Sequence, residues 1–80
     1  MPVVFRHGGC RLHFFSNEGD PREPPHIHVT RPPETAKFWL RPDVNVAYNK
    51  GFTARELAQL SAVILERRDE IEEAWHDHFA

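Results

Sequence analysis

Short apolar segments alternate with turn-forming residues over the first 49 positions, a pattern typical of antiparallel strands. Four segments pair into two predicted hairpins: Val3–Phe5 with Cys10–Ser16, and His26–Thr30 with Ala36–Leu40. Gly8 and Gly9 permit the positive φ of a tight turn in the first hairpin. Pro32 and Pro33 cannot donate ladder hydrogen bonds and end the strand in the second. Alternation over residues 44–49 indicates a short fifth strand at an edge.

The pattern changes to a helical period after Gly51. Thr53 and Glu56 have the spacing of a capping box, which marks the start of a helix. Apolar residues then recur at intervals of three, four and seven: Leu57, Leu60, Ile64, Ile71, Trp75 and Phe79. The polar run Arg67–Asp69 interrupts this stripe, so the sequence leaves open whether one long helix or two helices follow.

These elements predict an α+β fold, a small antiparallel β-sheet of four to five strands with one face covered by one or two C-terminal helices. We expect a single domain over residues 1–80, with a sheet half over 1–49 and a helical half over 53–80. A chain of 80 residues buries only about 60% of the surface that its unfolded form exposes. A homodimer or a heterocomplex is therefore expected.

Composition and charge indicate a folded protein without an internal disulfide, in which positive and negative charges are unequally divided along the chain. With 40% hydrophobic and 28% charged residues, the chain has enough core formers to fold. Residues 1–55 carry eight Lys/Arg against five Asp/Glu, and residues 56–80 carry two against seven, so the net charge of −2 divides into +3 and −5. This division fits a balanced surface or a sheet that faces an anion. The first residues lack the apolar run of a signal peptide, so the expected location is the cytoplasm, without membrane contact. A single cysteine, Cys10, excludes an internal disulfide and is expected to pack in a strand.

One side of the predicted second hairpin carries the candidate chemistry. Strand alternation sends His26 and His28 to one face together with Lys37 and Trp39 of the neighbouring strand. Three residues from nearby segments are placed to join them: His13, Glu18 and Glu23.

Three interpretations of this face remain open. In the first, His26 and His28 act as general base and acid on a phosphodiester, Lys37 neutralises phosphate and Trp39 stacks a base, as in a metal-independent ribonuclease without cofactor. In the second, His26 and His28 bind zinc or another transition metal. In the third, the histidines fix the preceding loop by hydrogen bonds to Glu18 or Glu23.

Several motifs together resemble a small bacterial family known as domain of unknown function 4160. They are Ser16–Gly19, Glu23–Val29, Ala36–Leu40, Asn49–Phe52, Glu56-Leu57 and Ala74-Trp75, which span nearly the whole chain. Members resemble components of type II toxin–antitoxin modules, commonly encoded beside a second small protein. The resemblance implies a cognate partner from the same operon and favours the RNA interpretation of the face.

The residues that match the family pattern are Glu18, His26, His28, Lys37, Trp39 and Glu56. We therefore expect an RNA-binding or ribonuclease-like toxin with His26, His28, Lys37 and Glu18 as catalytic residues. Trp39, Glu23, Trp75 and Phe79 are the expected substrate or partner contacts. The alternatives are a non-catalytic partner-binding module, such as an antitoxin or scaffold, and a metal-binding protein.

Overall fold

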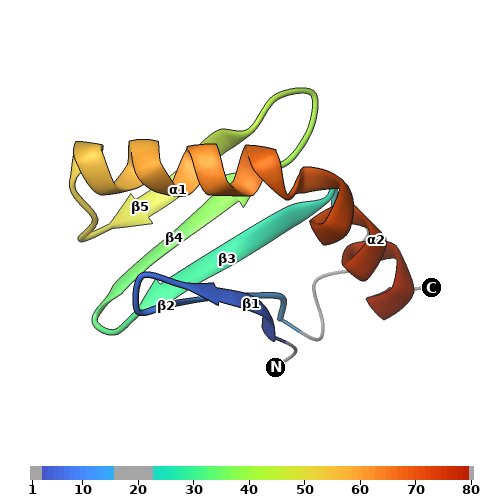
Figure 1. Ribbon diagram of the computed structural model, residues 1–80, viewed down its shortest axis with the longest axis horizontal. Helices are drawn as coiled ribbons and strands as arrows, with labels where there is room; N and C mark the ends of the chain where they lie inside the picture. The colour runs from blue at the N-terminus through green and yellow to red at the C-terminus, as the bar shows by residue number, and fades with distance from the viewer. Residues whose placement is uncertain (1–2, 16–22, 80) are drawn as a thin grey trace.

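The computed structural model describes residues 3–15 and 23–79, which form a five-stranded antiparallel sheet and two helices (Figure 1). The strands are β1 (Val3–His7), β2 (Cys10–His13), β3 (His26–Arg31), β4 (Glu34–Trp39) and β5 (Asn45–Lys50). The helices are α1 (Ala54–Glu66) and α2 (Arg68–His78). The strands lie in the sheet in their order along the chain, so β1 and β5 form its edges.

The predicted α+β class is confirmed, and so are the two hairpins and the fifth strand. The second hairpin is tighter than predicted. Arg31 pairs with Glu34, which leaves Pro32-Pro33 alone at the turn. The two prolines end the ladder as expected, but the strands extend up to them on both sides.

Side-chain alternation gives the sheet one apolar face, and α1 lies across it (Figure 1). The core residues from the sheet and helices include Leu12, Phe14, Ile27, Val29, Ala36, Phe38, Leu40, Leu60, Ile64, Ile71 and Trp75. Removal of a fully buried aromatic side chain such as Phe38 typically costs about 3–5 kcal/mol. This packing therefore accounts for much of the energy that holds α1 to the sheet.

The helical segment is two helices, separated at Arg67. Thr53 and Glu56 form the predicted capping box at the start of α1, with both reciprocal hydrogen bonds present. At Arg67 the backbone leaves helical geometry, with φ −106° and ψ 17°. The Arg67 guanidinium lies 3.6 Å from the centre of the Phe5 ring and bonds the Glu70 carboxylate at 2.6 Å. The polar run that interrupts the apolar stripe is therefore the junction at which α2 turns away from α1.

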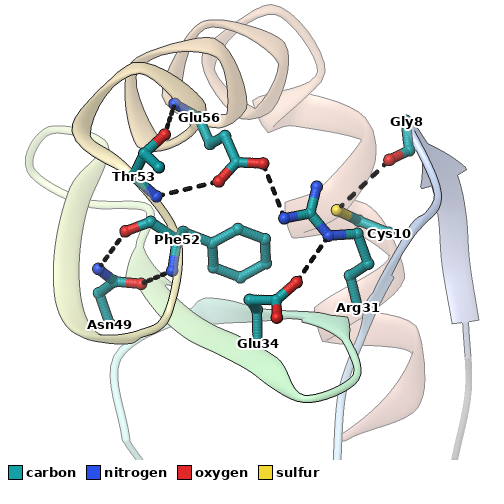
Figure 2. Close-up of polar contacts among 8 residues, drawn as sticks. All are labelled: Gly8, Cys10, Arg31, Glu34, Asn49, Phe52, Thr53 and Glu56. Atoms are coloured by element: carbon teal, nitrogen blue, oxygen red, sulfur yellow. Dashed lines mark hydrogen bonds and ion pairs between the residues drawn. The ribbon is translucent and has the colours of Figure 1, made fainter.

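Arg31 joins the tip of the second hairpin to the first turn of α1 (Figure 2). Its guanidinium donates to Glu34 at 2.9 Å and pairs with Glu56 at 2.7 Å. The same group lies 5.1 Å from the centre of the Phe52 ring. Asn49 accepts from the Phe52 N–H and donates to its carbonyl, which fixes the turn between β5 and α1. These contacts set where α1 begins above the sheet.

Cys10 lies buried beside this cluster, and its thiol is 3.8 Å from the Gly8 carbonyl oxygen (Figure 2). Burial raises the pKa of the Cys10 thiol, although the nearby Arg31 charge opposes this effect. The thiol therefore packs in the strand, as the sequence predicts. No helix among the described residues has the length and apolarity required to cross a bilayer.

We expect part of the stability to depend on pH through Glu56. The Thr53 N–H and the Arg31 guanidinium lower the pKa of Glu56 below its ordinary value of 4.5. A lowered folded-state pKa gives stability that is present at neutral pH and lost as the pH falls through that pKa. Glu56→Gln keeps the capping hydrogen bond but removes the charge. Its free energy of unfolding, measured by urea denaturation, should fall less steeply than that of the wild type between about pH 5 and 3.

The matched control is Glu73→Gln, which removes an exposed carboxylate from α2. Parallel curves for wild type and Glu56→Gln across this pH range would contradict the role assigned to the Arg31–Glu56 pair.

Candidate functional site

The distal face, defined as the side of the sheet away from α1, consists of three rows of side chains that cross the strands. Residues directly opposite each other on neighbouring strands point to the same side, so the register defines the rows. The first is the basic row: Arg6, Arg11, Thr30, Thr35 and Lys50. The second is the histidine row: Val3, His13, His28, Lys37 and Tyr48. The third holds His26, Trp39 and Asn45.

Three histidines of the distal face form a buried cluster. His13, His26 and His28 are 2%, 0% and 4% exposed. The His28 ring centre lies 5.8 Å from that of His13 and 5.2 Å from that of His26. Phe15 packs edge-on against His28 at 4.5 Å, and His13 contacts the Thr30 hydroxyl at 2.8 Å. The structure thus brings His26 and His28 together as predicted, but it buries them among other rings.

His26, at the start of β3, contacts the preceding segment, the end of β4 and helix α2. Its Nδ1 lies 3.0 Å from the Pro24 carbonyl oxygen. Because a carbonyl oxygen only accepts hydrogen bonds, Nδ1 carries the hydrogen atom and donates the hydrogen bond. The rings of Trp39 and Trp75 pack against the imidazole at 5.5 and 4.7 Å between centres. Trp75, predicted as a substrate or partner contact, is 3% exposed and therefore lies in the core.

Lys37 is bound on two sides. Its ammonium group pairs with Glu23 at 3.1 Å and lies 4.4 Å from the centre of the Trp39 ring. The Lys37 side chain is only 14% exposed. The ion pair with Lys37 therefore fixes Glu23 and the residues before β3. The third interpretation of this face predicts a hydrogen bond from Glu23 to a histidine instead.

The basic row was not identified from the sequence. Arg6 and Lys50 are exposed and Arg11 is half-buried. Among the described residues, none of these three cations forms an ion pair. Their positions in strands β1, β2 and β5 are far apart in the chain, and only the register of the sheet aligns them. The excess of positive charge in residues 1–55 was the available signal.

The remaining predicted residues do not join the cluster in the described part of the chain. Phe79 is half-buried directly after α2, with its ring centre 4.3 Å from that of Trp75. Glu18 lies outside the described residues. Within residues 3–15 and 23–79, no group of three or more His, Cys, Asp or Glu side chains has the arrangement of a metal site. The described histidine cluster thus provides no support for the metal interpretation.

The sequence profile of a family described as a domain of unknown function (DUF4160) matches residues 9–76. The chain belongs to the DUF4160 family. The matched region includes β2 to β5, α1 and most of α2, so both the histidine cluster and most of the basic row lie within the DUF4160 domain. No curated protein and no solved structure is significantly similar to the chain.

We expect the histidine cluster to contribute to stability. His26→Ala and His28→Ala each remove a buried ring together with its packing and polar contacts. Each substitution should lower the free energy of unfolding by about 1–3 kcal/mol. His76→Ala, at an exposed position on α2, is the matched control and should stay within about 0.5 kcal/mol of the wild type. Urea denaturation measures all three, and His28→Ala with wild-type stability would refute this prediction.

Proposed function

We propose that the chain is the RNA-binding component of a toxin–antitoxin-type module, and that RNA binds to the distal face of the sheet. The observation that carries this proposal is the separation of charge between the two layers. The three rows of the distal face contain four Lys/Arg and no Asp/Glu. Helices α1 and α2 together contain two Arg and seven Asp/Glu. A polyanion is therefore attracted to the sheet side and repelled from the helical side.

The side chains of the distal face suit a nucleic acid better than a compact anion. Phosphate contacts by Lys and Arg supply most of the affinity of a nucleic-acid-binding protein. Arg6, Arg11 and Lys50 lie on β1, β2 and β5, and the two edge strands β1 and β5 are about 19 Å apart at 4.7–4.9 Å per strand interval. This spread matches a chain of phosphates rather than one phosphate group. Trp39 and Tyr48 add aromatic rings of the kind that stack on bases.

The geometry favours binding over cleavage. A general acid or base must come within hydrogen-bonding distance of the proton that it transfers. His26 and His28 are 0% and 4% exposed, and Lys37 is paired with Glu23. The catalytic roles expected for these residues would require the cluster to open, whereas Arg6 and Lys50 are already accessible.

Loss of the basic row should abolish most RNA binding. The triple variant removes three cations, each with one expected phosphate contact: Arg6→Ala, Arg11→Ala and Lys50→Ala. The slope of log affinity against log salt should decrease by about 2, because each single-strand phosphate contact contributes about 0.7. Fluorescence anisotropy with a labelled RNA at several salt concentrations measures this change.

Arg55→Ala is the matched control, because it removes one exposed cation from the first turn of α1 on the other side of the sheet. It should bind RNA as the wild type does. Equal affinity and equal salt slope in the triple variant and the wild type would contradict the proposal. Gel analysis of the same RNA after incubation tests the expectation of binding without cleavage.

A second candidate function is pairing with a partner chain through β5. All six residues of this edge strand are exposed, including Val46 at 40% and Tyr48 at 45%. The outer edge of such a strand offers backbone N–H and C=O groups to another strand. The occupant is the cognate small protein from the same operon that the family resemblance implies.

This candidate predicts that a charge on β5 disrupts the complex. Val46→Lys places an ammonium group at the pairing edge, where it disfavours strand addition. Leu65→Lys, at a 55% exposed position on α1, is the matched control. Co-expression with the product of the neighbouring gene, followed by affinity purification, should recover the complex with wild type and Leu65→Lys but not with Val46→Lys. Recovery of equal amounts with Val46→Lys would exclude β5 as the contact.

A further inference from the structure

The basic row and the aromatic residues of the distal face have a fixed spacing. Lys50 and Tyr48 are two residues apart on β5, and their partners Thr35 and Lys37 are two apart on β4. Two residues along a strand span about 7 Å. The aromatic groups therefore lie beside the cations, one row further along the strands, and both point to the same side of the sheet.

Tyr48 is the most exposed aromatic residue of the three rows. It is 45% exposed and lies opposite Lys37, whose ammonium group is bound to Glu23. Trp39 is half-buried, and its ring is occupied by Lys37 and His26. Of these two rings, Tyr48 can thus accept a planar group without disruption of an existing contact to a cation.

A base can stack on a tyrosine only when that base is unpaired or lies at the end of a duplex. Inside a duplex both faces of each base are covered by its neighbours, and proteins recognise A-form RNA mostly through its backbone and shape. Single strands can instead place phosphates on cations and splay their bases onto aromatic side chains. The side-by-side arrangement of a cationic row and an exposed tyrosine fits the second case.

We infer that the ligand of the distal face is single-stranded RNA that runs across the strands, with its phosphates along Arg6, Arg11 and Lys50 and a base stacked on Tyr48. This inference rests on the proposed function and specifies its substrate class. It assigns Tyr48 the preference for unpaired RNA and assigns the basic row the attraction that any RNA would share. The two contributions can be separated by experiment, because they belong to different residues.

The experiment compares a labelled oligouridine of about 12 nucleotides with an RNA duplex of the same length, a size within the range of single-strand sites. Wild type should bind the oligouridine at least about tenfold more tightly than the duplex. Tyr48→Ala should weaken oligouridine binding by about 5- to 150-fold, which corresponds to loss of one stacked base, and should weaken duplex binding by much less, because only the terminal base pairs of a duplex can stack on the ring. Tyr48→Phe keeps the ring and should bind the oligouridine as the wild type does.

Lys50→Ala should weaken binding of both RNAs, because it removes a phosphate contact. Equal wild-type affinity for oligouridine and duplex, or unchanged oligouridine binding by Tyr48→Ala, would overturn the inference while leaving RNA binding by the basic row in place. Absence of binding to either RNA would overturn both the inference and the proposed function. Circular dichroism and urea denaturation check that each variant is folded, since Tyr48 lies at an exposed edge position.

Discussion

Burial of β3 on both of its faces is the constraint on which the rest of the structure depends. Ile27 and Val29 lie under the helices. On the opposite face of β3, His28 packs against Phe15, and His26 packs against Trp39 and against Trp75 of α2. A strand buried on both sides must fill both with well-packed groups, and buried polar groups must be hydrogen-bonded. The histidines meet this demand through aromatic packing and through bonds such as that from His26 to the Pro24 carbonyl. They therefore stabilise the centre of the sheet.

Within residues 3–15 and 23–79, Arg6, Arg11 and Lys50 of the flanking strands have no ion-pair partner. Arg31 is also a cation of β3, but it lies on the helical side and is bound between Glu34 and Glu56. Arg6, Arg11 and Lys50 lie on the other side, and α1 and α2 carry most of the carboxylates. The alternation of side chains along the strands thus places the apolar core on one face of the sheet and the cations of the basic row on the other. The positive charge of the domain is therefore concentrated on the side away from α1. That asymmetry is the physical basis of the proposal that RNA binds to the sheet.

The sequence predicts local features of the chain well, because short-range physics determines them. The capping box at Thr53, the turn at Gly8 and Gly9 and the shared face of His28 and Lys37 all follow from residue type and period. The burial of the histidines could not be predicted. Strand alternation indicates on which face of the sheet a side chain lies, but not which other residues pack over that face. The basic row required the pairing of β1 with β2 and of β4 with β5, which are long-range contacts that only the folded sheet defines.

The central claim is that the distal face of the sheet is the RNA-binding surface. Its most direct test is an NMR titration of the isotopically labelled wild-type chain with oligouridine, following the side-chain signals of Arg11, Trp39 and Tyr48 together with the backbone amides. The account predicts that shifts concentrate on the distal-face side chains and on β1, β2, β4 and β5, while the amides of α1 remain unchanged. Shifts that concentrate on α1 and α2, with the Arg11 and Tyr48 signals unmoved at saturation, would contradict it.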